Sequence, residues 1–382
     1  MAVTWKQYSG VWTMQSQMQA VSAGTWTGIP LPGLYSWGWN FYGQLGLGNK
    51  TYYSSPKQVG ALTNWSSVSC GVSYTVSIKT DGTIWSWGYN AYGQLGLGNI
   101  TDYSSPKQVG ALTNWSSVSC GYSHTVSVKT DGTLWSWGYN ASGQLGQGNT
   151  TNLNSPKQVG ALTNWSSVSC GVYHTVSVKT DGTLWSWGAN NYGQLGLNNV
   201  TTYSSPKQVG ALTNWLSVSC GYYHTVSIKT NGTLWSWGRN ANGELGLGNT
   251  TYYSSPKQVG ALTNWSSVSC GTYYAASIKT NGTLWSWGQN NIGQLGLGNQ
   301  TYYSSPKQVG ALTNWSSVSC GASHTVSIKT DGTLWSWGNN GFGALGLNNT
   351  TNYSSPKQVG ALTSWTKLSK GAVAYIALAI HS

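Results

Sequence analysis

The first residues that could do chemistry are histidines spaced fifty residues apart, because imidazole nitrogens are common metal ligands. They are His124, His174, His224 and His324. Other units carry Tyr74, Tyr274 or Ala374 at the same position. A metal site would not survive such exchanges, so we predict that each histidine forms a hydrogen bond inside its own unit and that there is no metal site.

Six cysteines share another position, from Cys70 to Cys320, and Lys370 takes that position in the last unit. Equivalent side chains in successive units point the same way, whereas a disulfide needs Cβ atoms about 4 Å apart with converging directions. The sequence also lacks the close Cys-x-x-Cys pairs of a zinc site. We therefore predict buried free thiols.

Acidic residues are too few and too scattered to form a catalytic pair. Asp102 and Glu244 lie far apart, and the other four occupy Asp-Gly pairs, at Asp81, Asp131, Asp181 and Asp331. No P-loop, Gly-x-Ser-x-Gly or His-Glu-x-x-His pattern occurs. We expect no enzyme, no catalytic residue and no cofactor.

The elements that carry these residues belong to a near-perfect internal repeat. Ser-Trp-Gly recurs from Trp37 to Trp337, and Ser-Pro-Lys-Gln-Val-Gly-Ala-Leu-Thr recurs from Ser55 to Ser355, each every 50 residues. Residues 33–382 make seven units of 50, counted without insertion or deletion, and residues 1–32 precede them. With 51 Gly, 24 Trp and only 6% charged residues, the chain suits a repeat array rather than a disordered tail.

Each unit is predicted to hold four short strands. Alternating patterns occupy 83–88 and 124–130, and two further short strands are predicted at 105–112 and 116–121. Asp131-Gly132 then links to the next Thr-Leu-Trp-Ser-Trp, and this pair is typical of a type I′ turn with positive φ at both positions. Four strands, a period near 50 and no helical pattern describe a propeller blade, so we predict an all-β, seven-bladed propeller.

The two ends of the array must close the ring. The chain stops at Ser382, where other units enter the Asp-Gly turn, and the array starts just after that turn. We predict that 375–380 pairs antiparallel with 34–38, which makes the last blade a composite. Ala377 and Ala379 are taken as replacements of Ser and Lys, and their apolar character compensates for the missing turn.

Three segments resemble the repeat of the regulator of chromosome condensation family. They are Trp-Ser-Trp-Gly-Tyr-Asn-Ala-Tyr-Gly-Gln-Leu-Gly (85–96), Ser-Pro-Lys-Gln-Val (105–109) and Cys-Gly-Tyr-Ser-His-Thr (120–125). The resemblance covers all seven units and implies a seven-bladed propeller. The family includes a guanine-nucleotide exchange factor, ubiquitin-ligase modules and a protein inhibitor of β-lactamase, so it implies a binding surface without fixing one ligand.

The units differ mainly in three short windows rich in tyrosine, which offers flat apolar area with a polar tip. The windows follow Ser-Trp-Gly, follow Gly-Asn, and lie between Cys-Gly and His-Thr; the third holds Tyr122, Tyr173, Tyr222 and Tyr223. From the first two windows the candidate binding residues are Trp39, Phe41, Tyr42, Tyr52, Tyr53, Tyr89, Tyr92, Tyr103, Tyr139, Tyr192, Tyr203, Arg239, Tyr252, Tyr253, Tyr302, Tyr303 and Tyr353.

The net charge of +12 usually suggests nucleic acid or an anionic surface. Most of the basic residues, however, fall in two series, one from Lys57 to Lys357 and one from Lys79 to Lys329, each with one lysine per unit. The charge is therefore spread round the ring, and nucleic acid is not favoured. No run of about 18 apolar residues occurs, so no membrane span is expected.

Residues 1–32 form an N-terminal extension without the apolar core of a signal peptide. Trp12, Met14 and Met18 alternate with polar residues as in an amphipathic strand, and Trp5 precedes them. We expect either a strand packed on the ring or an arm that docks onto another subunit or a larger assembly.

These features predict a non-enzymatic recognition or structural propeller that binds protein or surface glycan through its tyrosine-rich loops. Low charge and near-identical repeats favour a bacterial-surface or phage-particle setting, extracellular or in a virion, and a cytoplasmic location stays open. One alternative is a regulator of a small GTPase or of chromatin, similar to an exchange factor. Another is a protein inhibitor that covers an enzyme's active site.

Overall fold

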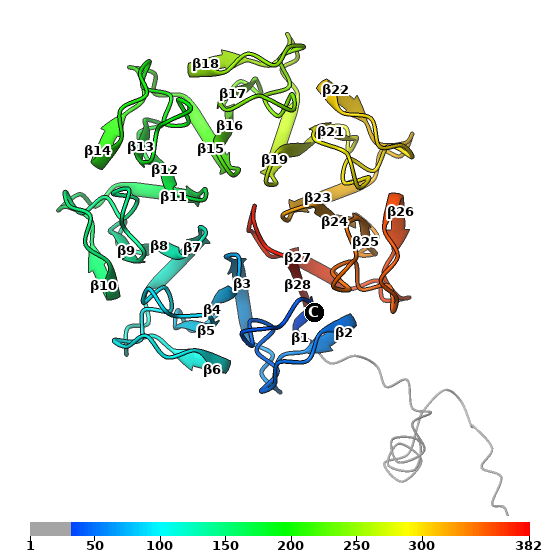
Figure 1. The fold of residues 1–382 in the computed structure, drawn as a ribbon, viewed down its shortest axis with the longest axis horizontal. Helices are drawn as coiled ribbons and strands as arrows, with labels where there is room; N and C mark the ends of the chain where they lie inside the picture. The colour runs from blue at the N-terminus through cyan, green and yellow to red at the C-terminus, as the bar shows by residue number, and fades with distance from the viewer. Residues whose placement is uncertain (1–31) are drawn as a thin grey trace, which may run out of the picture. The chain divides into compact units, whose positions relative to one another are not determined.

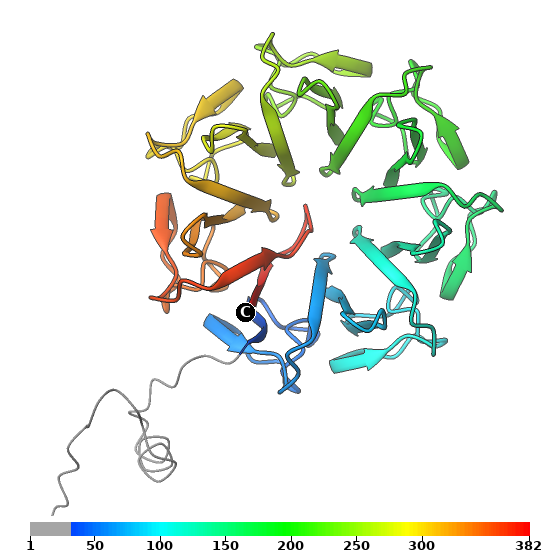
Figure 2. The ribbon, with the colours of Figure 1, turned by 180° about the vertical axis from the view of Figure 1, so that it is seen from behind.

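The computed structural model describes residues 32–382, in which strands are the regular elements. They form seven four-stranded antiparallel sheets that stand as blades round a central channel (Figures 1 and 2). This confirms the predicted all-β, seven-bladed propeller. In the same part of the chain, no helix is long and apolar enough to span a membrane.

In six blades the strands run outward in chain order from the channel to the rim. The innermost strands are β3 (Trp65–Cys70), β7 (Trp115–Cys120), β11 (Trp165–Cys170), β15 (Trp215–Cys220), β19 (Trp265–Cys270), β23 (Trp315–Cys320) and β27 (Trp365–Leu368). The second strands are β4 (Tyr74–Lys79), β8 (His124–Lys129), β12 (His174–Lys179), β16 (His224–Lys229), β20 (Tyr274–Lys279), β24 (His324–Lys329) and β28 (Ile376–His381).

The outer half of each blade consists of two further strands. The third strands are β5 (Ile84–Gly88), β9 (Leu134–Gly138), β13 (Leu184–Gly188), β17 (Leu234–Gly238), β21 (Leu284–Gly288), β25 (Leu334–Gly338) and β1 (Gly33–Gly38). The outermost strands are β6 (Tyr103–Gln108), β10 (Leu153–Gln158), β14 (Tyr203–Gln208), β18 (Tyr253–Gln258), β22 (Tyr303–Gln308), β26 (Tyr353–Gln358) and β2 (Tyr53–Gln58).

The turn between the second and third strands differs from the predicted type I′ turn. Gly82 has φ +75°, but Asp81 is not among the described residues with positive φ. Asp81 Oδ1 instead accepts hydrogen bonds from the amide and the hydroxyl of Thr83, at 2.9 and 2.6 Å. This side-chain cap favours a type I turn in which only the final glycine is left-handed, so the type I′ prediction was wrong.

The composite blade closes the ring as predicted. Strand β28 pairs antiparallel with β1 along its whole length, in the sheet order β2-β1-β28-β27. Ile376, Leu378 and Ile380 are buried against the neighbouring blade of β3–β6, where they pack with Trp65 and Trp87. The two chain ends of the array thus form one blade without a covalent turn between them.

The last unit contains an insertion. The sequence count of seven equal units without insertion or deletion was therefore wrong. Trp65 pairs with Lys79, whereas its equivalent Trp365 pairs with His381, two residues later than strict repetition would place the partner. Two extra residues therefore lie in the loop between β27 and β28. Two turn residues are missing where the array ends, so the total length conceals both changes.

This shift also corrects the assignment of the alanines in β28. Ala377 lies opposite Trp37, and Thr75 lies opposite the equivalent Trp87. Ala377 therefore replaces a threonine and Ala379 a serine, while His381 takes the position of the lysine. The strand is more apolar than its siblings, but the predicted Ser and Lys replacements were wrong.

The core of the molecule lies between blades rather than in one centre. Between the blades of β3–β6 and β7–β10, Tyr74, Val76 and Leu95 pack against Trp115 and Trp137. Trp137 Nε1 also donates to the carbonyl of Gln94 across this interface, at 2.9 Å. Because every interface repeats this arrangement, the ring positions its loops rigidly.

Candidate functional site

One face of the ring carries the loops between innermost and second strands, such as 71–73, and those between third and outermost strands, such as 89–102. A contact between Tyr139 and Tyr173, whose ring centroids are 6.0 Å apart, joins the two kinds of loop. We call this the aromatic face. The opposite face, which carries the Asp-Gly turns, is called the turn face.

A first series of contacting rings crosses the aromatic face from the composite blade. Centroid distances are 6.0 Å for Trp39–Tyr42, 4.6 Å for Tyr42–Tyr89, 6.3 Å for Tyr89–Tyr92 and 4.9 Å for Tyr92–Tyr139. These are ordinary distances for favourable aromatic pairs. Further rings that extend the series are Phe41, Tyr52, Tyr122, Tyr173, Phe342 and Tyr375.

A second series covers loops of the three blades β11–β14, β15–β18 and β19–β22. In order of contact it contains Tyr252, Tyr192, Tyr223, Tyr222 and Tyr273, with centroids 4.4 to 5.8 Å apart. The Arg239 guanidinium lies over Tyr273, 4.4 Å from its centroid.

In the first series, burial raises the pKa of Tyr173 to about 12, so this hydroxyl stays protonated at neutral pH.

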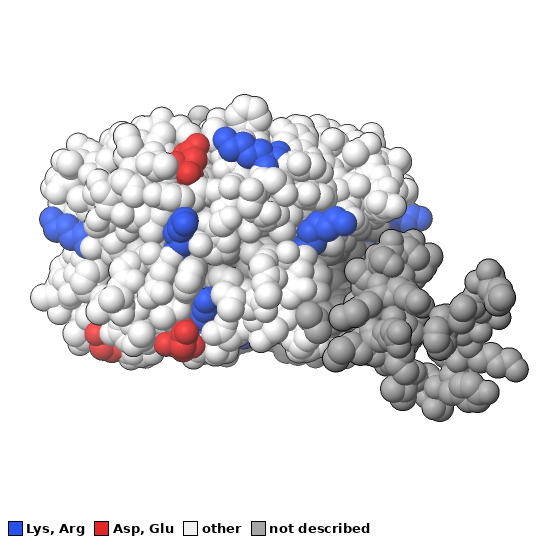
Figure 3. Space-filling view, turned by 90° about the horizontal axis from the view of Figure 1, so that it is seen from below, with Lys and Arg blue, Asp and Glu red and all other residues white. Residues whose placement is uncertain are grey.

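The aromatic face carries few charges. Asp102 Oδ1 accepts a hydrogen bond from Asn90 N at 2.7 Å, which links the two ends of its loop. Asn152 Oδ1 accepts the same bond from Asn140 N in the next unit, so this bond does not require a charged residue. On the side of the ring that Figure 3 shows, the described charged side chains are scattered and separated by uncharged surface. This distribution agrees with charge spread round a ring rather than gathered into a stripe.

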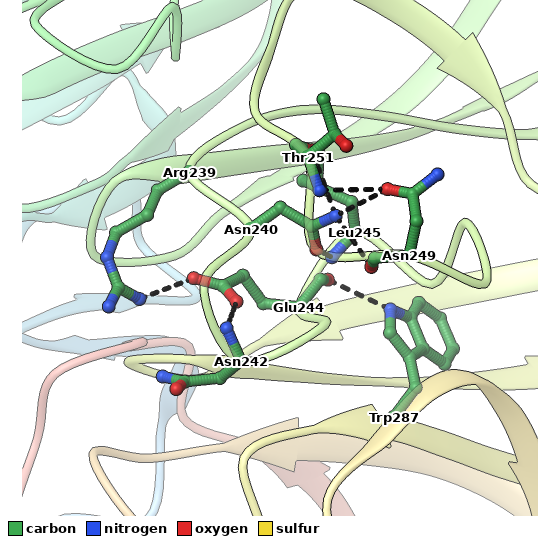
Figure 4. A network of polar contacts seen from close by, with 8 residues as sticks. All are labelled: Arg239, Asn240, Asn242, Glu244, Leu245, Asn249, Thr251 and Trp287. Atoms are coloured by element: carbon green, nitrogen blue, oxygen red, sulfur yellow. Dashed lines mark hydrogen bonds and ion pairs between the residues drawn. The ribbon is translucent and has the colours of Figure 1, made fainter.

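The side chain of Arg239 is held by the buried carboxylate of Glu244 (Figure 4). Glu244 stands where five other units have glutamine and the last has Ala344; Gln94, for example, accepts from Tyr92 N at 3.0 Å. Glu244 makes the same bond to Asn242 N at 2.7 Å, and its second oxygen lies 2.5 Å from Arg239 Nη1. Burial raises the pKa of Glu244, and the positive charge of Arg239 offsets only part of this rise. Arg239 is thus engaged inside its loop, and its role in binding stays a prediction.

Six of the predicted tyrosines stand at the start of outermost strands instead of joining either series. The Tyr53 hydroxyl accepts from Asn49 Nδ2 at 3.3 Å, and Lys57 Nζ lies 5.6 Å from the ring centroid. Its neighbour Tyr52, by contrast, accepts from Trp39 Nε1 at 2.9 Å on the aromatic face. The six residues are Tyr53, Tyr103, Tyr203, Tyr253, Tyr303 and Tyr353.

Seven rings of the aromatic face were absent from the predicted binding residues: Tyr122, Tyr173, Tyr222, Tyr223, Tyr273, Phe342 and Tyr375. Tyr273 lies in the third variable window and could have been found there. Tyr375 is 41% exposed and contacts Trp39 at 5.9 Å, but the two-residue insertion hides its relation to that window. The predicted docking-arm residues Trp5, Trp12, Met14 and Met18 lie outside the described residues.

The buried histidines join neighbouring blades, so the predicted hydrogen bond inside one unit was wrong. His124 Nε2 lies 3.2 Å from Thr175 Oγ1 in the next blade, and His174 meets Thr225 in the same way. Tyr74 likewise reaches across, donating to the His124 carbonyl at 2.5 Å. Second-strand side chains of this type point into the blade interface, which explains the exchange of His and Tyr.

Six free cysteines, from Cys70 to Cys320, are buried, as predicted. Burial raises the pKa of Cys120 to about 12, so it is not a thiolate near neutral pH. Within residues 32–382 no group of three or more His, Cys, Asp or Glu side chains is placed to hold a metal ion.

The native protein is expected to show no fast reaction with a thiol reagent at pH 8, because its six cysteines are buried and protonated. In urea all six should react. A Leu112→Cys variant serves as a control, since Leu112 is 48% exposed and its thiol should react at once. Fast labelling of the unaltered native protein would show that the blade interfaces open readily.

Fold and surface together define a class of protein: a closed propeller ring that offers a broad aromatic face for binding. The chain belongs to the family described as the regulator of chromosome condensation (RCC1) repeat. The family profile matches residues 33–78, 81–128, 131–178, 181–228, 231–278, 281–328 and 331–376.

Solved structures of similar shape share the fold. Human WBSCR16 has a TM-score of 0.82 at 21% identity, covering 92% of this chain and 99% of that one. Prp20p from Saccharomyces cerevisiae has a TM-score of 0.80 at 19% identity, covering 93% and 92%; its structure was described with its binding to Gsp1p and histones. A second Prp20 structure, bound to Kap60, gives 0.80 at 18% identity and covers 100% and 96%.

One curated protein matches over a short stretch. The ultraviolet-B receptor UVR8 of Arabidopsis thaliana is 39% identical over 54 residues, which is 14% of this chain and 12% of the receptor. Such a match is about the length of one repeat unit, so it concerns the repeat and not the receptor as a whole.

Proposed function

We propose that this propeller is a non-catalytic module of the regulator type that binds a partner protein on its aromatic face. The observation that supports the proposal is the pair of contacting aromatic series across one face of the ring. Among its rings, Tyr92 is 39%, Tyr122 is 37% and Phe342 is 43% exposed. Tyrosine and tryptophan are the residues that most often dominate binding energy at protein interfaces.

The surroundings of these rings suit a protein partner. Backbone strands fix both ends of each loop, and the rings support one another by contact, so binding requires little ordering of side chains. Few charged side chains of the aromatic face would lose their hydration when a partner binds.

The structural relatives favour a protein partner over a sugar. The Prp20 structures were described with binding to Gsp1p and histones and in complex with Kap60, which are all proteins. The regulator alternative therefore has more support than the bacterial-surface or phage-particle setting, and the comparisons give no support to glycan binding. Because these relatives are under 25% identical, their partners are candidates to test and are not assigned to this chain.

The proposal is tested with two matched triple variants. The first changes Tyr92, Tyr122 and Tyr173 to Ser on the aromatic face. The second changes Leu112, Leu162 and Leu212 to Ser on the turn face, where each leucine is 48 to 49% exposed. Both are compared with the unaltered chain against a panel of small GTPases, core histones and a glycan array.

We expect saturable binding to a protein of the panel, weakened at least tenfold by the tyrosine variant and unchanged by the leucine variant. Faster release of fluorescent GDP from a bound GTPase would identify an exchange factor. Binding to glycans alone would contradict the proposal and restore the sugar hypothesis. Equal protein binding by both variants would also contradict it, because the contact would then lie elsewhere.

A further inference from the structure

The two extra residues of the composite blade fall in a loop that enters the central channel. This loop continues from β27 to the middle of the ring in both views (Figures 1 and 2). Ala372 and Val373 are buried there and pack with Val172, which belongs to a blade on the far side. Thr272 Oγ1 donates to the carbonyl of Ala372 at 3.3 Å. The loop therefore obstructs the channel at the aromatic face.

A cavity of about 600 Å³ remains in the channel. It is bounded by the innermost strands and, at its closed end, by residues 369–372. Exposed residues at the start of these strands, such as Ser116 and Lys367, also line it, so it opens on the turn face. Its volume is in the range of small-molecule sites. No acidic side chain is among the described residues that line it.

Lys370 is the cation at the closed end of this cavity. Its backbone is fixed, because Lys370 O accepts from Cys70 N at 2.7 Å and Lys370 N donates to Val68 O at 3.1 Å. Its side chain is exposed yet surrounded by the channel walls, and this enclosure lowers its pKa. In residues 32–382 the ion pair is that of Arg239 and Glu244, so Lys370 has no carboxylate partner.

Serine hydroxyls stand one position before Lys370 in the repeat. The Oγ atom of Ser119 accepts the amide hydrogen of Cys170 at 2.9 Å, and the same bond recurs at 2.9 to 3.0 Å in the following blades. A hydroxyl that accepts in this way keeps its own hydrogen to donate. The serines that keep a hydrogen free of any described protein acceptor are Ser119, Ser169, Ser219 and Ser269.

We propose that the cavity binds a small organic anion, entering from the turn face, whose phosphate or carboxylate group meets Lys370 and the serine hydroxyls. A cation and several serine hydroxyls line the same end of a cavity whose described lining lacks carboxylates. Charge-assisted hydrogen bonds of this kind are about twice as strong as neutral ones. The cavity opens on the side opposite the aromatic face, and the loop that follows β27 closes its other end. A ligand therefore enters without crossing the aromatic face, so this proposal is tested independently of partner binding there.

The test is calorimetric titration of the full chain with inorganic phosphate, glycerol 3-phosphate and citrate, with glycerol as the neutral control. Lys370→Cys introduces the residue that six sibling units carry, and Lys370→Gln serves if that variant loses its fold. Lys107→Met is the matched control, because it removes one exposed cation from an outermost strand. Circular dichroism checks that every variant is folded.

We expect at least one anion to bind saturably to the unaltered chain and to Lys107→Met, and at least tenfold more weakly to the Lys370 variants. Glycerol should not bind, and added salt should weaken the anion's affinity. A phosphate preference over citrate would identify a phosphorylated ligand, and the reverse a carboxylate. Absence of binding by all three anions, or equal binding by the Lys370 variants, would overturn the proposal.

Discussion

Removal of residues 376–382 is expected to abolish cooperative folding of the ring. These residues form β28, the strand that joins the two ends of the array. Ile376, Leu378 and Ile380 are no more than 6% exposed. Burial of each contributes about 1.5–3 kcal/mol, so their loss approaches the ~5–15 kcal/mol that holds a whole domain together. Strands β1 and β27 would also be left with unpaired edges, which promote aggregation.

Urea unfolding followed by tryptophan fluorescence measures this effect. The shortened protein should show no cooperative transition, or one at much lower urea. Adding a peptide with the sequence of residues 375–382 should restore the transition, whereas a peptide of scrambled order should not. A shortened protein as stable as the full chain would contradict the closure and show that the other six blades are sufficient.

The blades could be predicted from the sequence because each local signal repeats seven times and agrees with the global fold. The irregular blade could not. Its two-residue insertion lies before β28, and two turn residues are missing between Ser382 and Gly33, so the total length matches seven equal units. The shift is revealed by the register of β28 against both of its neighbours, as in the pairing of Trp365 with His381. That same insertion creates the loop that enters the channel.

The sequence predicted a candidate site formed by tyrosine-rich loops, but it did not separate the tyrosines of the aromatic face from those of the outermost strands. Tyr52 and Tyr53 are adjacent, yet Tyr52 joins the aromatic face while Tyr53 begins an outermost strand. The sequence holds a signal for this difference, because the position of Tyr53 is tyrosine in six of the seven units, whereas the position of Tyr52 varies among Tyr, Asp, Asn and Thr. The lysine four residues after each strand tyrosine was a readable signal, because its ammonium lies near that ring in the structure.

The histidines show why partners across blades escape sequence reasoning. His124 and Thr175 are 51 residues apart, and only the ring places them 3.2 Å from each other. The third equivalent histidine, His224, has no such bond, because the next blade has Ala275 in place of the threonine that His124 and His174 meet. Its two ring nitrogens are buried without a partner. The exchange of Thr for Ala is visible in the sequence. That it leaves His224 without a hydrogen-bond partner can be recognised only from the contact between the two blades.

Acid is expected to destabilise the ring well above the pH at which carboxylates titrate. Burial lowers the pKa of His124, His174 and His224 from 6.5 to about 3 each, and that of His324 to about 4. The unfolded chain therefore binds protons below pH 6.5 that the folded chain refuses. Stability is full above pH 6.5 and falls, per histidine, by up to ~1.4 kcal/mol for each pH unit below it. At pH 5 the four together cost on the order of 8 kcal/mol.

Urea unfolding at pH 7.5, 6 and 5 measures this loss, and a His→Tyr triple variant at 124, 174 and 224 isolates its cause. Tyrosine already fills this position as Tyr74 and Tyr274, so the variant should fold and should lose about three quarters of the dependence between pH 7 and 5. Asp131→Asn is the matched control, because hydrogen bonds from Thr133 already hold the pKa of Asp131 below 3.8. It should leave that dependence unchanged. If the tyrosine variant kept the full dependence, the histidines would have to be protonated or hydrated in the folded ring, and the tight blade interfaces described above would be wrong.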